Sequence, residues 1–204
     1  MEERRRETYA VALEQARRDF AARDPDRAAR EAGGSREGSA IILRHFNTLY
    51  VVDHPSGRVC PRANPGQQAG EVTRLLVLHY LITTRGAEPR GRWISFREVP
   101  GGDVYLPAFN RRSVAWLVRR FGEDPAGLVE AGVRLGGQPA GIGDAAITLH
   151  AFPLVPVTLV LWRGDDEIPT AGNVLFDETA PLHLPTEDLA VVAGETMAVL
   201  SRKS

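Results

Sequence analysis

Arginine and aromatic side chains gather around one Pro-Gly-Gly sequence in the stretch GRWISFREVPGGDVYLPAFNRR. Guanidinium groups bind carboxylates and phosphates in a bidentate manner and stack on flat π-systems. Arg97, Arg111 and Arg112, with Trp93 and Tyr105 beside them, would therefore suit a flat, anionic ligand. The other interpretation is that these arginines form surface ion pairs and the aromatic rings pack in the core.

The pattern around the Pro-Gly-Gly sequence predicts a β-hairpin. We expect one strand over Trp93–Val99 and a returning strand over Val104–Leu106. Successive side chains of a strand point to opposite faces, so Trp93, Ser95 and Arg97 would share one face, while the residues between them look like core. The predicted ligand-binding face of the strand is therefore Trp93, Ser95 and Arg97.

Histidine and carboxylate side chains suggest a second kind of chemistry. His79 lies in the apolar helical segment LLVLHYLI, where an imidazole either donates a hydrogen bond inside a core or serves a cofactor as an axial or hydrogen-bonding group. An alternative hypothesis is an enzyme in which His79 or His183 works with Asp177 or Glu98 as acid–base partners on a small anionic substrate. The five histidines have no metal-ligand spacing, so no metal site is predicted.

Charge is unevenly distributed along the chain. The net charge of −1 argues against a general nucleic-acid binder. Residues 85–120 carry 8 basic and 3 acidic groups, whereas residues 121–204 carry 4 basic and 12 acidic groups. A third hypothesis is therefore a protein-interaction module, whose basic middle segment docks an acidic partner or the acidic part of a second copy. Since 24 of the 25 basic residues are arginine, a single arginine is weak evidence for a site.

Composition and segment patterns indicate a cytoplasmic protein. No apolar run approaches the roughly 18 residues that a membrane span needs, and the start MEERRRETYA is charged where a signal peptide would be apolar. We therefore expect no membrane partner. The single cysteine, Cys60, excludes a disulfide or an all-cysteine metal site within one chain.

Helices and strands alternate in clumps, which predicts the α+β class with a mixed or mostly antiparallel sheet packed with about five helices. We expect one domain over residues 1–204, with an N-terminal helical segment over residues 1–36. Asp24, Asn110, Asp124 and Thr186 are the expected N-caps of helices. Strands are expected over residues 39–60, 144–152, 156–164 and 173–177, and a further helix over residues 71–86.

Five segments together resemble a known family: LHYL, RWISFREVPGGDVYLPAFNRR, RRFG, LVLWRGDDEIP and VLFDETAPLHLPTEDLAVV. They are similar to the domain of unknown function 3786 family of anaerobic bacteria, whose members are sometimes fused to a four-cysteine iron–sulfur module. The similarity runs over most of the chain, but Cys60 cannot replace four cysteines. The resemblance implies a cytoplasmic protein near anaerobic electron-transfer or one-carbon metabolism.

These observations lead to one preferred hypothesis. We expect an accessory or binding domain for an anionic aromatic cofactor of the tetrapyrrole or pterin type, since such molecules are flat and anionic. Arg97, Arg111 and Arg112 would pair with its charges, and Trp93 and Tyr105 would stack on its ring. The sequence identifies neither the cofactor nor any catalytic activity.

Overall fold

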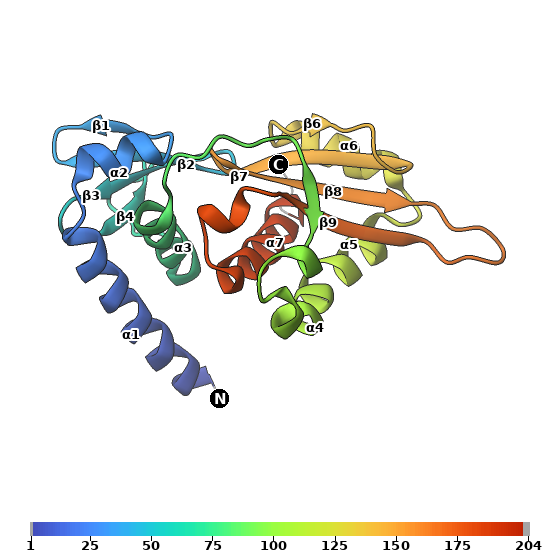
Figure 1. Ribbon diagram of the computed structural model, residues 1–204, viewed down its shortest axis with the longest axis horizontal. Coiled ribbons are helices and arrows are strands. Elements are labelled where there is room, and N and C mark those ends of the chain that lie inside the picture. The colour runs from blue at the N-terminus through green and yellow to red at the C-terminus, as the bar shows by residue number, and fades with distance from the viewer. Residues whose placement is uncertain (1, 202–204) are drawn as a thin grey trace. The chain divides into compact units, whose positions relative to one another are not determined.

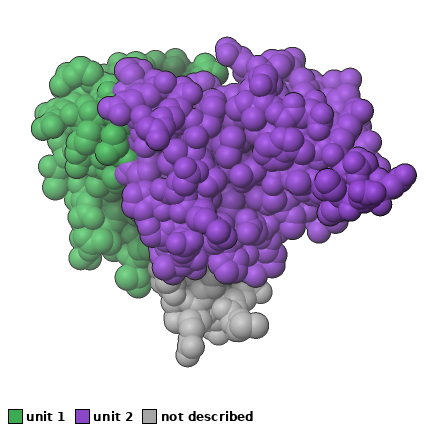
Figure 2. Space-filling view, turned by 45° about the vertical axis from the view of Figure 1, so that its right-hand side comes forward, with its two compact units in different colours: residues 1–87, 152–154, 182–184 green, residues 88–151, 155–181, 185–204 purple. Residues whose placement is uncertain are grey.

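A computed structural model describes residues 2–201 of the chain, with side chains from Tyr9 onward. The chain divides into two compact units (Figure 2). Unit 1 comprises residues 1–87, 152–154 and 182–184, and unit 2 comprises residues 88–151, 155–181 and 185–204. Helices and antiparallel strands occur in both units, so the predicted α+β class is confirmed. Whether the chain behaves as one domain stays a prediction.

Unit 1 combines a four-stranded sheet with three helices (Figure 1). The sheet order is β1-β2-β3-β4, and each neighbouring pair is antiparallel. Leu13, Ala16 and Phe20 lie three or four residues apart on the first helix and are buried, and this helix packs against α3. The elements are α1 (Glu2–Ala21), α2 (Pro25–Glu31), β1 (Ser35–Glu37), β2 (Ala40–His45), β3 (Thr48–Asp53), β4 (Arg58–Pro61) and α3 (Glu71–Thr83).

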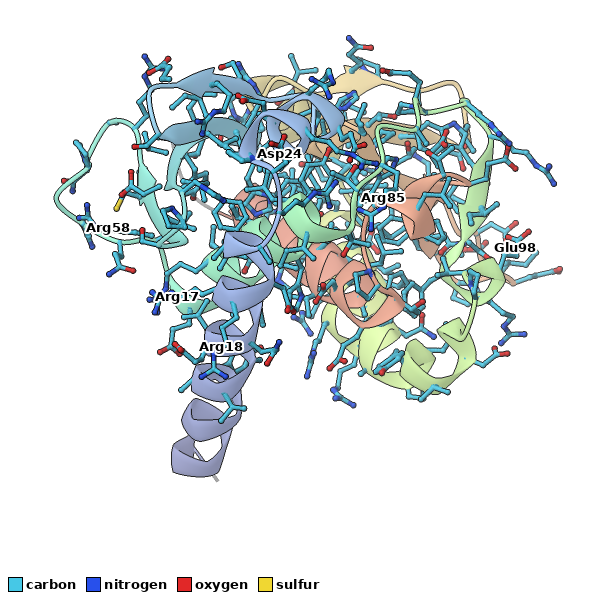
Figure 3. All side chains as sticks on the ribbon, turned by 60° about the vertical axis from the view of Figure 1, so that its left-hand side comes forward. Arg17, Arg18, Asp24, Arg58, Arg85 and Glu98 are labelled. Atoms are coloured by element: carbon cyan, nitrogen blue, oxygen red, sulfur yellow. The ribbon has the colours of Figure 1, made fainter. Side chains whose placement is uncertain are left out.

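Two arginines of unit 1 have a structural role at the end of α3. The guanidinium group of Arg23 donates to the carbonyl oxygens of Ile82 and Thr84. Arg85, which is labelled in Figure 3, donates to the same two oxygens, each at 2.9 Å. The last carbonyl groups of a helix have no partner within it, so these two side chains satisfy them. The helix ends at Thr83, three residues before Gly86, where the sequence predicts its end.

Tyr80 is fully buried in unit 1. Its ring stacks on that of Phe152, with centroids 4.3 Å apart and planes 12° apart. Its hydroxyl donates to the carbonyl oxygen of Ala32 at 3.0 Å and accepts from the backbone N–H of Leu154 at 3.3 Å. A fully buried tyrosine needs such partners for its hydroxyl, and here they join three distant stretches of the chain.

Unit 2 contains a five-stranded sheet in the order β5-β9-β8-β7-β6 and four α-helices (Figure 1). Strand β9 pairs antiparallel with both β5 and β8. Helix α4 packs against α7, and α5 packs against β9. The elements are β5 (Trp93–Ser95), α4 (Gly102–Arg112), α5 (Val114–Phe121), α6 (Pro125–Arg134), β6 (Gln138–Pro139), β7 (Ala145–Phe152), β8 (Val155–Trp162), β9 (Ala171–Asp177) and α7 (Thr186–Ser201), with 3-10 turns at Phe96–Glu98 and Ala180–Leu182.

The predicted hairpin around the Pro-Gly-Gly sequence is wrong, because helix α4 replaces its second strand. Strand β5 ends at Ser95, whose backbone N–H and hydroxyl donate to the carboxylate of Glu98 at 2.7 and 2.8 Å. This capping box begins a 3-10 turn instead of continuing the strand. Gly101 then has φ of +74°, and a side chain on Gly102 would collide with the carbonyl oxygen of Phe96.

Aromatic packing explains why this segment is helical. The rings of Phe96 and Phe109 stack with centroids 4.1 Å apart and planes 5° apart, and both lie about 6.3 to 6.4 Å from the ring of Phe176 on β9. Phe109 makes these contacts from helix α4, which packs against the 3-10 turn that carries Phe96. The tertiary contact therefore overrides a local sequence that contains Pro107 within the helix.

The predicted helix caps are partly confirmed. Asp24 accepts the backbone N–H of Arg27, and Asp124 accepts that of Gly127, so each caps its helix as expected. Asn110 is not a cap, because it lies inside α4. Thr186 is the first residue of α7, and its hydroxyl donates to the carbonyl oxygen of residue 100 at 2.6 Å.

Candidate functional site

A cavity of about 540 Å³ lies in unit 2 between the end of β5, helices α4 and α5, and strand β9. Its volume falls in the range of roughly 300–1,000 Å³ that is typical of small-molecule sites. The 3-10 turn and α4 form one side of the cavity, the start of α5 forms another, and β9 contributes its first half. The lining residues are Ser95, Phe96, Arg97, Leu106, Phe109, Asn110, Arg111, Val114, Ala115, Gly172 and Asn173.

The cavity brings together three of the residues predicted to bind a ligand: Ser95, Arg97 and Arg111. Arg97 lies in the 3-10 turn and Arg111 in the last turn of α4, so separate elements supply the two guanidinium groups. The strand alternation that grouped Ser95 with Arg97 is not the cause, since the strand ends at Ser95. The 3-10 turn that follows the strand brings Arg97 to the same cavity as Ser95.

The other predicted ligand-binding residues lie outside this lining. Trp93 is half-buried on β5, and Tyr105 is half-buried on α4. Arg112 belongs to the side of α4 that faces α7, because its Cβ lies 3.9 Å from the place that a Cβ on Gly194 would occupy. His79 is partly exposed on α3 in unit 1. Their roles in ligand binding stay predictions.

The two guanidinium groups at the cavity keep their positive charge largely uncompensated. Arg97 has one carboxylate neighbour, Asp103, at 4.0 Å, and their side chains are 73% and 80% exposed. Water screens a pair of this kind strongly, so it contributes little. Within the described part of the chain, the side chain of Arg111 makes no ion pair or hydrogen bond. An anion between the two side chains would therefore meet donors that are not already occupied.

Two neighbouring arginines, Arg90 and Arg92, form surface ion pairs, as the other interpretation predicts. Arg90 and Arg92 both contact the carboxylate of Glu178, at 3.2 and 3.1 Å. Their side chains are exposed, and their charge is shared with one acid. The arginines of this segment thus fall into two groups. Arg90 and Arg92 pair with Glu178, whereas Arg97 and Arg111 line the cavity.

Apolar side chains and two amides complete the cavity. Leu106, Val114 and Ala115 expose apolar atoms there, above the stacked phenylalanine pair. Asn110 and Asn173 add amide groups, and the oxygen of Asn173 accepts the backbone N–H of the next residue, which leaves its NH₂ group to donate. Neither asparagine is a predicted site residue. Asn173 comes near Arg97 only through the pairing of β9 with β5, which no local pattern indicates.

Asp177, a candidate acid–base group, has a structural role at the end of β9. Its carboxylate is fully buried and accepts the backbone N–H groups of Arg90, Gly91 and Thr179 at 3.1, 2.7 and 3.0 Å, and the Thr179 hydroxyl at 2.7 Å. Burial alone would raise its pKa, but these hydrogen bonds outweigh that effect and hold the pKa of Asp177 below its usual value. The ionised carboxylate thus holds in place the segment that leads into β5.

Glu98 and His183 are also held by neighbouring groups. The backbone N–H of Ser95, and then its hydroxyl, lower the pKa of Glu98, which is labelled in Figure 3. His183 is buried in unit 1, where its Nδ1 lies 2.8 Å from the hydroxyl oxygen of Thr84. These contacts give each group a role in local structure.

Metal and membrane features are absent from the part of the chain that the structure describes. Within residues 2–201, no three His, Cys, Asp or Glu side chains come together as a metal site would require. No helix among those residues combines the length and the apolar character that crossing a membrane demands.

The chain can now be placed in a family. Residues 24–198 match the family described as Domain of unknown function (DUF3786). No curated protein and no solved structure matches the chain. The family match extends from the cap of α2 to the last turns of α7 and includes every residue that lines the cavity. The chain therefore belongs to the DUF3786 family.

Proposed function

We propose that unit 2 is an accessory binding domain for an anionic aromatic cofactor of the tetrapyrrole or pterin type. The proposal includes a cytoplasmic location and a place near anaerobic electron-transfer or one-carbon metabolism. The acidic groups of the ligand lie between Arg97 and Arg111, and its ring rests on Leu106, Val114 and Ala115. Asn110 and Asn173 donate to polar atoms at the edge of the ring.

The observation that carries the proposal is the pair of guanidinium groups at one cavity. Arg97 and Arg111 come from two elements and lack a close carboxylate partner, unlike Arg90 and Arg92. Both side chains are exposed, so their N–H donors are open to the oxygens of an anion. A ligand that supplies a counter-charge and covers the apolar side chains fits both features of the cavity.

Replacing Arg97 with alanine should weaken ligand binding by more than about tenfold, which corresponds to about 1.4 kcal/mol. The melting temperature should stay nearly unchanged, because the Arg97 side chain is exposed and its one ion pair is long. Isothermal titration calorimetry with hemin, a corrinoid and pterin-6-carboxylate measures the change. Arg111→Ala should have a comparable effect for the same reason.

Arg119→Ala is the matched control for both variants. Arg119 is exposed on α5 and does not line the cavity, so its loss removes one positive charge without touching the site. Equal affinities for wild type, Arg97→Ala and Arg111→Ala would contradict the proposal. A third variant, Ala115→Trp, fills the cavity from an exposed position and should abolish binding without lowering stability.

A further inference from the structure

A second cavity of about 700 Å³ lies in unit 2 between α5, α6 and the last turn of α7, and it shares no residue with the first. We infer that this second cavity binds a planar heteroaromatic anion. Trp116 packs against the ring of the ligand, Arg120 and Arg134 bind its anionic group, and Glu130 accepts hydrogen bonds from its N–H groups. The inference is independent of the function proposed for the first cavity.

The ring of Trp116 lines the second cavity and is held in place by Phe121. Its ring lies 6.0 Å from the ring of Phe121 at 73°, an edge-to-face contact that fixes its orientation. Phe121 is buried, whereas Trp116 is partly exposed and lines the cavity. An aromatic ring that is held in place and open on the side of the cavity is a surface on which heteroaromatic bases stack.

Two arginines, Arg120 and Arg134, line the second cavity. The guanidinium carbon of Arg120 lies 4.8 Å from the centroid of the Phe121 ring, and this cation–π contact holds the group over the ring while leaving its N–H donors unused. Arg134 is exposed in the last turn of α6. Within the described residues, neither arginine forms an ion pair. The two groups are therefore suited to a phosphate or carboxylate.

Two carboxylates line the second cavity, and that of Glu130 selects among aromatic anions. Asp124 is engaged as the cap of α6, where it accepts the N–H of Gly127 at 3.0 Å. Glu130 is exposed, lines the cavity and forms no ion pair within the described residues. A carboxylate accepts two parallel N–H donors, so it favours rings with an amino group beside a ring N–H, as in guanine. A simple aromatic acid lacks these donors.

Guanosine 5′-monophosphate contains all three features and serves as the probe. Calorimetry should detect its binding to the full chain, and guanosine and ribose 5-phosphate should each bind at least about tenfold more weakly, because one lacks the anion and the other the ring. Trp116→Ala, Arg120→Ala and Arg134→Ala should each weaken binding by at least about tenfold. Glu130→Gln should reduce the preference for this probe over uridine 5′-monophosphate.

Two controls separate this cavity from the first. Arg119→Ala removes a neighbouring charge on α5, and Arg97→Ala removes a guanidinium of the first cavity, so both should bind the probe as wild type does. Loss of binding in Arg97→Ala, with Arg120→Ala unaffected, would overturn the second site, as would an absence of binding at millimolar probe. Arg120 and Arg134 are exposed, so their variants keep the test valid if Trp116→Ala fails to fold.

Discussion

Replacing Asp177 with alanine should lower the free energy of unfolding by about 3–5 kcal/mol. The carboxylate is fully buried and accepts four hydrogen bonds, from the backbone of Arg90 and Gly91 and from both donors of Thr179. Alanine leaves those donors without a partner and frees the segment that leads into β5. Urea denaturation of wild type and variant measures the difference in free energy.

The pH dependence of stability provides a second measurement on Asp177. Its folded-state pKa is lowered, so ionised Asp177 stabilises the protein above its unfolded pKa of about 3.9, and this contribution is lost as the pH falls through the folded value. The stability difference between wild type and Asp177→Asn should therefore be full at pH 7 and shrink below about pH 4. Asp166→Asn, at an exposed position, is the control and should show no such difference. A constant difference across this range would contradict the assigned role.

Replacing Phe109 with alanine should also lower the free energy of unfolding by about 3–5 kcal/mol, the range measured for buried aromatic residues. Phe109 is 2% exposed and stacks on Phe96, and both residues line the first cavity. The variant loses this contact and leaves a void between α4 and the sheet. Urea denaturation should show the loss, and Phe109→Leu should recover part of it because leucine fills more of the space.

Val104→Ala is the control for the packing argument, because Val104 is 78% exposed on the same helix and should change stability little. Similar stabilities of Phe109→Ala and Val104→Ala would contradict the position of α4 over the sheet. They would instead favour the hairpin that the local sequence predicts, in which Val104–Leu106 is a returning strand.

The sequence predicts well those elements whose local pattern agrees with their tertiary role. Helix α1 has a clear apolar stripe, Asp24 and Asp124 are strong capping residues, and β8 is apolar along its length. Helix α4 differs from the predicted hairpin because Pro107, two glycines and β-branched residues are typical of a hairpin sequence. The capping box at Ser95 and Glu98 was the available signal against a long strand.

The sequence predicts the kinds of side chain at the first cavity better than it predicts which residues line it. The concentration of arginine indicates the segment around Arg97 and Arg111, and these two residues line one cavity, while their role in ligand binding stays a prediction. Trp93 and Tyr105 lie outside that lining. Tyr105 belongs to helix α4 and not to a returning strand, whereas Trp93 keeps its predicted place in β5. Asn173 could not be found, since only the pairing of β9 with β5 brings it to the cavity.

The most direct test of the central proposal is native mass spectrometry, combined with a UV–visible spectrum, on the full chain purified under anaerobic conditions from its own host or a closely similar one. We expect a bound small molecule that absorbs in the near-ultraviolet or visible range and is lost from Arg97→Ala but retained by Arg119→Ala. A ligand-free protein that also binds neither hemin, a corrinoid nor pterin-6-carboxylate would contradict the proposal.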